Sequence, residues 1–135
     1  MKLDFMNQLN KKINNLNFYA HCRIGLLDEG ESLSIMAMPG GEETVFYDGV
    51  RDKDYQVQIN AKSKNQENCF DSLTTIYQEL ENLEELSSQN GSYDFQKITI
   101  PSLPSLVTMD EDGFFIYALN ISAKITIYKG VDLNG

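Results

Sequence analysis

At 135 residues and 15.3 kDa, the chain has room for one domain with a core of its own but is short for a two-domain enzyme with an interdomain cleft. Its formal charge of −9, from 20 acidic and 11 basic residues, argues against a nucleic-acid-binding protein, because such proteins gain affinity by neutralising phosphates. Since no segment approaches the roughly 20 apolar residues that cross a bilayer, and the N-terminus lacks the apolar run of a signal peptide, we expect a single cytoplasmically made domain over residues 1–135 without membrane contact.

The first part of the chain predicts a helix and then a pair of strands. Residues 2–16 carry apolar side chains at helical spacing with Asn, Gln and Lys between them, which is typical of an amphipathic helix. Apolar runs at 18–27 and 31–38 are separated by Asp-Glu-Gly. Because a short polar segment with glycine between two apolar runs is a turn signal, these runs predict a β-hairpin.

The stretch MPGGEETVFYDG at residues 38–49 raises the first functional question, because a glycine-rich loop that opens a helix can bind phosphate. Here strand signals flank the glycines on both sides, and no Lys, Ser or Thr stands where a phosphate loop needs one. The stretch therefore predicts two chain reversals, at Pro39-Gly40-Gly41 and at Asp48-Gly49, which frame a short strand at 44–47. Two interpretations are open for Met36, Met38, Phe46 and Tyr47, an exposed contact surface and the sheet core, and we expect the core.

The clearest strand lies at residues 54–62. Two sets of side chains alternate there, with Tyr55, Val57, Ile59 and Ala61 on one side and Gln56, Gln58, Asn60 and Lys62 on the other. Such alternation predicts that one side covers a core while the other meets water or a partner. Residues 119–127 repeat the same one-sided pattern.

Residues 66–86 predict a long amphipathic helix that Asn65 or Asn68 caps and that the polar segment 87–92 ends. Three acidic residues lie off its apolar stripe without matching histidines: Glu81, Glu84 and Glu85. They predict a solvated helix face and not a carboxylate metal site.

The last part of the chain predicts a strand at 93–100, a Pro-rich bend, a hairpin formed by 106–109 and 114–130, and a loose tail at 131–135. The order is helix, several strands, long helix and several strands. This order indicates an α+β fold, in which an antiparallel β-sheet has its apolar face covered by an N-terminal helix and one long amphipathic helix.

The reactive side chains form no catalytic motif. His21 and Cys22 are neighbours on a predicted strand, so they point to opposite faces and cannot act as a nucleophile–base pair. A pair of His21 with Cys69 stays geometrically open, although no third residue is present to orient it. We expect both cysteines to be buried free thiols, and we predict no catalytic residue, no metal and no cofactor.

The segment TMDEDGFF resembles a fragment of a calcium loop, with Asp110, Asp112 and Gly113 at plausible spacing. Aligning Gly113 with the invariant glycine of such a loop puts Thr108 at the first ligand position and Leu119 where the bidentate Glu belongs. The segment instead predicts a hairpin turn whose glycine adopts a left-handed conformation.

An ordered set of segments carries a family resemblance: MPGG, YDG, a strand running into KNQ, the long helix, NGSYDF and DEDGFFIYALNISAKITIYKG. Over residues 3–129 this order resembles the phage minor capsid and tail-terminator proteins encoded among the head–tail joining genes of long-tailed phages and prophages of Gram-positive bacteria. The resemblance implies an antiparallel sheet flanked by helices and a non-enzymatic protein of the virion. It further implies a homo-oligomeric ring, typically a hexamer, that caps the tail tube at the head–tail junction.

The partners that the resemblance implies are other copies of the chain, the major tail tube protein and a head-completion or connector protein. DNA passes through such a ring without being specifically bound. Two other roles stay open, a head-completion or stopper protein at the same junction and a phage-encoded adaptor that binds a host protein. For the subunit or partner interface we predict the polar strand side and two loops, with the candidate residues Gly40, Gly41, Glu42, Gln56, Gln58, Asn60, Asp110, Glu111 and Asp112.

Overall fold

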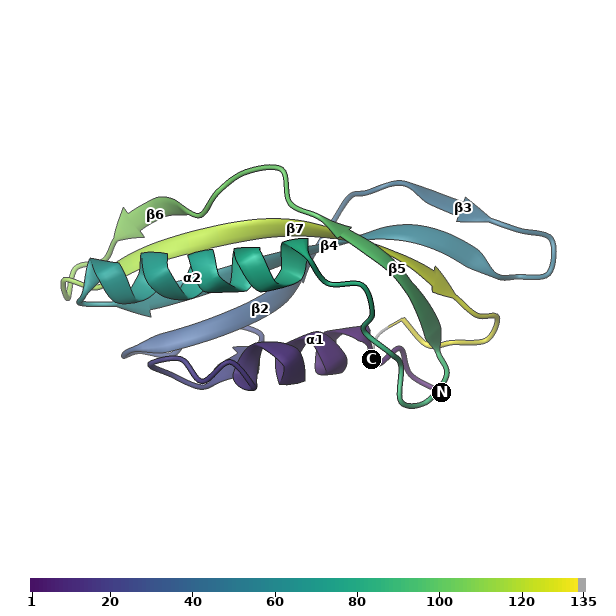
Figure 1. The fold of residues 1–135 in the computed structure, drawn as a ribbon, viewed down its shortest axis with the longest axis horizontal. Helices are drawn as coiled ribbons and strands as arrows, with labels where there is room; N and C mark the ends of the chain where they lie inside the picture. Colours follow the sequence, from purple (N-terminus) through teal and green to yellow (C-terminus); the bar gives the residue numbers. More distant parts are fainter. Residues whose placement is uncertain (134–135) are drawn as a thin grey trace.

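The computed structural model describes residues 1–133, which form one open sheet with two helices (Figure 1). The elements in chain order are α1 (Phe5–Asn14), β1 (Cys22–Ile24), β2 (Ser32–Met38), β3 (Glu43–Val45), β4 (Arg51–Ser63), α2 (Gln66–Glu81), β5 (Tyr93–Thr99), β6 (Ser105–Met109) and β7 (Phe115–Ile127). This is the α+β arrangement that the sequence predicts.

Two thirteen-residue strands, β4 and β7, form the centre of the sheet and pair antiparallel along their whole length. The sheet order is β1-β2-β4-β7-β5, with β3 also paired to β4 and β6 also paired to β7. Directly opposed residues of an antiparallel pair share a face. Val57 and Ile59 of β4 therefore lie on the same face as their partners Ile121 and Leu119 of β7, and all four are buried.

Each side of this central pair carries two short strands that lie end to end. β2 and β3 both run antiparallel to β4, so the chain keeps its direction from one to the other. Residues 39–42 lie opposite only two residues of β4, Asp54 and Tyr55. The Pro-Gly-Gly segment is therefore a bulge within one edge of the sheet, and the chain reversal predicted there is wrong.

The bulge depends on Gly41, which has a φ of +84°. A Cβ at this position would lie 2.1 Å from the carbonyl oxygen of Asp54, so a side chain meets both a steric and a conformational barrier. Glycines with positive φ serve bulges as well as turns, which is why the sequence pattern did not separate the two. The second predicted reversal is confirmed, because the N–H of Phe46 donates to the carbonyl of Val50 across the Asp48-Gly49 turn at 2.8 Å.

β5 and β6 repeat the arrangement on the other side of β7, where residues 100–104 lie opposite residues 119–121. The predicted hairpin between β6 and β7 is confirmed. The N–H of Gly113 donates to the carbonyl of Asp110 at 3.1 Å, and Gly113 has the expected left-handed φ of +86°.

β1 corrects the hairpin predicted between residues 18 and 38, because β1 is a three-residue strand that runs parallel to β2. Gly25, with a φ of +120°, follows the strand and opens a loop. The ammonium of Lys62 donates to the backbone carbonyls of Asp28 and Glu29, both at 3.0 Å. The Asp-Glu-Gly segment thus belongs to a loop held by a distant strand and is not a two-strand turn.

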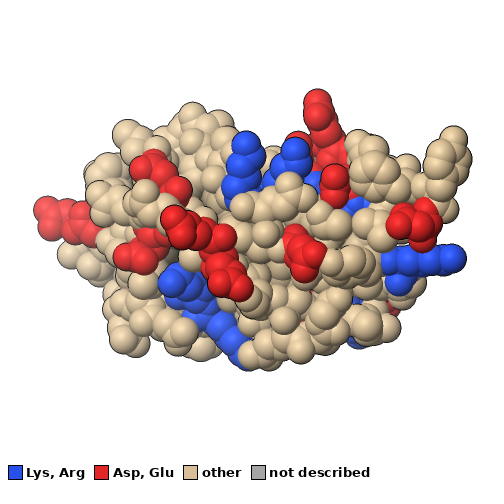
Figure 2. All heavy atoms as spheres, turned by 45° about the vertical axis from the view of Figure 1, so that its right-hand side comes forward, with Lys and Arg blue, Asp and Glu red and all other residues tan. Residues whose placement is uncertain are grey.

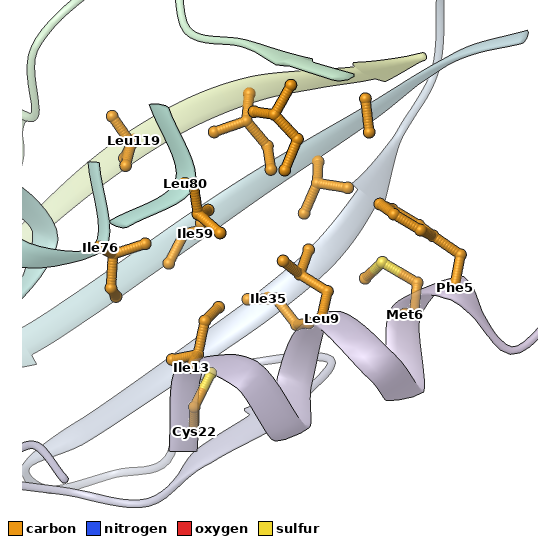
Figure 3. Packing of buried hydrophobic residues seen from close by; sticks show 14 of the residues in the cluster. Phe5, Met6, Leu9, Ile13, Cys22, Ile35, Ile59, Ile76, Leu80 and Leu119 are labelled. Atoms are coloured by element: carbon orange, nitrogen blue, oxygen red, sulfur yellow. The ribbon is translucent and has the colours of Figure 1, made fainter. Parts of the chain in front are cut away.

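Both helices cover the same face of the sheet, as predicted (Figure 1). α1 lies against β1 and β2, and α2 lies against β4, β7 and β5. Figure 3 shows Leu9 and Ile13 of α1 and Ile76 and Leu80 of α2 among the apolar side chains of the sheet, including Ile59. All five are essentially inaccessible to solvent, so the apolar stripes of the two helices and the apolar face of the sheet make one core.

α2 ends at Glu81, five residues earlier than predicted. Of the two predicted caps, Asn65 and Asn68, the structure selects Asn65, because its side-chain oxygen accepts the N–H of Glu67 at 3.0 Å. Leu86 is buried without being helical, and its carbonyl accepts the hydroxyl of Tyr93 at 2.7 Å. Because this buried leucine keeps the helical spacing, the sequence pattern predicts a longer helix than the chain forms. The segment after Glu81 is instead held in a non-helical conformation by a tertiary hydrogen bond.

The carboxylate of Asp4 fastens the N-terminus to the loop before β5. It accepts the hydroxyls of Ser88 and Ser92 at 2.7 and 2.9 Å and the backbone N–H of Gln89 at 2.8 Å. Burial by itself raises the pKa of Asp4, but these hydrogen bonds outweigh it and hold the pKa below its usual value. Asp4 is therefore ionised at neutral pH, and its carboxylate stabilises the folded state.

The C-terminal tail, predicted to be loose, is hydrogen-bonded to the N-terminus. Lys2 and Asp132 form an isolated parallel bridge, and the N–H of Leu3 donates to the carbonyl of Asp132 at 2.8 Å. The prediction of a loose tail is therefore wrong for residues 131–132. Residues 134–135 lie outside the described residues.

The hairpin of β3 and β4, here called the arm (residues 43–53), extends past both helices (Figure 1). Phe46 is 47% exposed and Tyr47 at the turn is fully exposed. Met36 is only partly buried and Met38 is 38% exposed. The prediction that these four residues belong to the core is wrong, because neither helix covers the arm or the opposite side of β2.

Candidate functional site

The predicted strand residues lie on the side of the sheet opposite the helices. Gln56 and Gln58 alternate with buried Val57 and Ile59, so their side chains point away from the core. The side-chain nitrogen of Gln56 donates to the hydroxyl of Ser122 at 2.8 Å. The same nitrogen donates to the backbone carbonyl of Asp54 at 3.1 Å, so the side-chain oxygen of Gln56 is the group that stays available as an acceptor for a partner.

Gln58 makes the next rung of this ladder between β4 and β7. Its amide nitrogen donates to the side-chain oxygen of Asn120 at 3.2 Å, and the pair is exposed. We call the four residues Gln56, Gln58, Asn120 and Ser122 the amide ladder. The ladder fixes amide and hydroxyl groups on a rigid strand pair, an arrangement suited to hydrogen bonding with another protein surface.

Asn60 lies in a different environment from the two glutamines. It is only 8% exposed and pairs across the sheet with Ser34 and Ala118, which are also buried. The accessible part of the polar side therefore ends before Asn60, and the amide of this residue is largely out of reach of a partner.

The structure brings the first predicted loop next to the amide ladder. A Cβ on Gly41 would come within 2.9 Å of the side-chain nitrogen of Gln56, so the bulge and the ladder are in contact. Gly40 and Glu42 flank Gly41 and are exposed, and the carbonyl of Glu42 accepts the N–H of Asp54 at 2.9 Å. These three loop residues form one continuous surface with Gln56.

The second predicted loop, the turn Asp110–Gly113, lies near the far end of β4. Asp110 faces the ammonium of Lys62 at 3.4 Å. Its carboxylate also accepts the N–H groups of Phe114 and Asp112 at 2.9 and 3.0 Å. The hydrogen bond from the N–H of Phe114 has the largest effect on Asp110 and lowers its pKa. Burial acts in the opposite direction, but the N–H of Asp112 and the ammonium of Lys62 also lower the pKa, which therefore stays below its usual value. Glu111 is exposed beside it.

The two loops do not form one site. Gln56 and Lys62 are six residues apart on one strand, a separation of about 20 Å. Sequence reasoning missed Lys62, which joins β4 to the Asp110 turn and to the loop at Asp28 and whose ammonium also lies 5.0 Å from the Phe114 ring centroid. Its position on the polar side of a strand gave no signal of this role, since the loops that it holds are distant in sequence.

The basic side chains do not gather into one surface in the view of Figure 2. Lys and Arg lie in small separate groups with Asp and Glu between them. On the arm, Arg51 forms an ion pair with Glu43 at 2.6 Å. The acidic residues Glu81, Glu84 and Glu85 are exposed, as the prediction of a solvated face requires.

The cysteines are buried free thiols, as predicted. Burial raises the pKa of Cys22 to about 12 and that of Cys69 to about 11, so both stay protonated at neutral pH. The thiol of Cys69 contacts the carbonyl of Phe115 at 3.5 Å, while His21 is exposed. A protonated, inaccessible thiol is a poor nucleophile, so the geometry gives no support to a His21–cysteine catalytic pair.

Two further properties of the described part of the chain bear on function. Residues 1–133 contain no group of three or more His, Cys, Asp or Glu side chains that could hold a metal ion. Neither helix in these residues has the length and apolar character needed to span a bilayer.

A comparison with models of protein families gives a match. The sequence model of a family described as "Bacteriophage tail terminator protein" matches residues 6–127. A search of curated proteins found no match. The matched segment runs from α1 to the last residue of β7, so it includes both loops and the amide ladder.

Proposed function

Because the chain belongs to the bacteriophage tail terminator family, we propose that it ends the growth of the tail tube by closing into a ring on the tube end, and that the ring then contacts the head connector. The match over residues 6–127 is the observation that carries this proposal. Membership of this family supports the role of a structural protein of the phage tail. The ring, its number of subunits and its place at the head–tail junction are the finer statements that we propose.

Ring closure sets a requirement on the subunit surface. In a head-to-tail ring, one surface of each copy contacts a different surface of the next, and the rotation between copies closes after a fixed number. We propose six copies in one ring. The open sheet supports this mode, because its two outer edges are formed by different strands.

We propose that the predicted surface residues meet the tube or connector protein. Gly40, Gly41 and Glu42 with the amide ladder make one contact surface, and the turn of Asp110, Glu111 and Asp112 makes a second. The support is chemical, since rigid amide, hydroxyl and carboxylate groups are available there for hydrogen bonds across a wet interface.

We also propose that DNA passes the ring without being held. Six copies at −9 each have a formal charge of −54, and charges in a narrow channel act over the roughly 8 Å screening length of physiological salt. We therefore expect no retardation of duplex DNA by the purified protein at low salt, where counterion release most favours phosphate contacts. A salt-sensitive shift at micromolar protein would contradict passive passage and favour a DNA-gripping stopper.

A tube-capping assay tests the proposed function. Tail tube protein of the same phage is polymerised with and without the purified chain, and tubes are measured by electron microscopy. We expect shorter tubes with added density at one end. Tubes of unchanged length with bare ends would contradict termination.

A pair of variants tests the proposed contact surface in the same assay. Gln58→Lys puts a charge on the amide ladder, whereas Gln78→Lys makes the same change at an exposed position of α2 outside the proposed surfaces. We expect capping to be lost only for Gln58→Lys, because an added ammonium is desolvated in the interface. Equal capping by both variants would remove the ladder from the interface.

A further inference from the structure

The outer edge of the arm is the strand β3, whose one apolar side chain, Val45, is 58% exposed. β3 pairs with β4 and with no other strand among the described residues, and all three of its residues are exposed. The N–H of Phe46 donates to Val50 and the N–H of Asp54 donates to Glu42. Since donors alternate in direction along an antiparallel strand, the N–H of Val45 points outward, away from β4.

β6 forms a second unpaired strand edge, along the opposite edge of the sheet from β3. It pairs only with β7 in the part of the chain that the structure describes, and its five residues are all exposed. Leu106, Val107 and Met109 are 51–59% exposed. The N–H of Asp110 donates to Phe114, so by the same alternation the N–H of Met109 points away from β7.

The β6 edge lacks the charges that usually protect such strands. Soluble proteins guard an exposed edge with lysines or other charges, because an apolar edge with free N–H and C=O groups pairs with other chains. No charged residue occurs between Lys97 and Asp110. The bulge between Leu106 and Thr108 keeps the regular part of this edge short, which matches the three residues of β3.

We propose that β3 of one copy of this chain pairs antiparallel with β6 of the next copy, so that the sheet continues from subunit to subunit. This inference rests on the proposed ring and names the surfaces that join it. The two edges differ and lie at opposite ends of the molecule (Figure 1). Each copy therefore gives β3 to one neighbour and receives β3 from the other, which is the head-to-tail contact that a closed ring needs.

Strand direction fits the pairing. β3 and β7 both run antiparallel to β4, and β6 runs antiparallel to β7. β3 and β6 therefore run in opposite directions within one copy. A neighbour placed beside it with the same side of the sheet facing the same way would form an antiparallel pair, the mode of every strand pair in this sheet except β1 with β2.

The side chains fit as well. Val45 lies opposite Arg51 and so faces the side of the sheet that carries the helices, as Leu106 does opposite Tyr117. Pairing brings these apolar residues onto one side. Phe70 of α2, 42% exposed and edge-on to Tyr117 at 6.4 Å between centroids, extends that apolar surface. No unpaired charge is trapped, because Glu43 of β3 already has Arg51 as its partner.

A cross-linking experiment tests the contact directly. The double variant Val45→Cys with Leu106→Cys is treated with a short bis-maleimide, whose reach covers a register shift of two residues. The native thiols Cys22 and Cys69 are fully buried, so the wild-type chain is the blank. We expect a ladder of covalent multimers for the double variant alone. Dimers from Val45→Cys alone would indicate pairing of two β3 strands and overturn the proposal.

A second pair of variants tests the outward N–H. Val45→Pro removes this donor while the bonds of β3 to β4 remain, and Val45→Thr keeps it. We expect the mass in solution to fall from oligomer to monomer only for Val45→Pro, with thermal midpoints within a few degrees of each other. An oligomer that survives Val45→Pro and does not cross-link would overturn the edge pairing but leave the ring. A wild-type chain that stays monomeric at high concentration and on tubes would contradict both.

Discussion

Replacing Gly41 with alanine tests the bulge that carries the first candidate loop. The new Cβ would lie 2.1 Å from the carbonyl oxygen of Asp54, and the residue would keep a φ of +84°. The left-handed conformation costs roughly 1–2 kcal/mol for a residue with a side chain. Relief of the clash moves the Asp54 peptide and strains its 2.9 Å hydrogen bond to Glu42, which adds about 1 kcal/mol.

We therefore expect Gly41→Ala to lower the free energy of unfolding by about 2–3 kcal/mol in urea denaturation, a fall of roughly 5–12 °C in Tm. Gly40→Ala is the matched control, because Gly40 also has a positive φ, +102°, but a Cβ there meets nothing within 4 Å. It should lose only the conformational part, roughly 1–2 kcal/mol. Equal losses for the two variants would refute the close approach of the bulge to β4.

Three further predictions concern single side chains. Asp4→Asn should lower stability at pH 7 by about 2–3 kcal/mol, and since the folded pKa of Asp4 is lowered, the difference from wild type should shrink as the pH falls below about 4; a constant difference would contradict the charged role. In Ellman titrations of the native protein, Cys22 and Cys69 should react only after unfolding, and prompt labelling would contradict their burial. Asn60→Lys should lower Tm more than Gln58→Lys, because only Asn60 is buried, and calorimetry that finds equal midpoints would contradict this.

Elements with a strong repeating pattern could be predicted from the sequence. The alternation in β4 and β7 predicted two strands and the buried side of each, because one side of each strand lies on the core. That these two strands pair at the centre of the sheet was not predicted. The apolar stripe of α2 and its Asn65 cap followed from helical spacing and local capping chemistry. The hairpin turn at Gly113 followed from turn chemistry in the same way.

Features that depend on tertiary contacts could not be predicted. Gly40 and Gly41 suit a reversal and a bulge equally, and only the pairing of β3 with β4 decides between them. The parallel direction of β1 depends on a loop that Lys62 holds from a distant strand. In the candidate site, the pattern identified the outward side of β4 but not the burial of Asn60, which comes from its neighbours across the sheet.

The tail length of particles made by a phage that lacks this chain is the most direct test of a terminator role. Electron microscopy should show tails of variable and excessive length that carry no heads, and expression of the wild-type chain should restore uniform tails. Free tails of normal length beside heads that have lost their DNA would contradict termination and favour a stopper at the same junction.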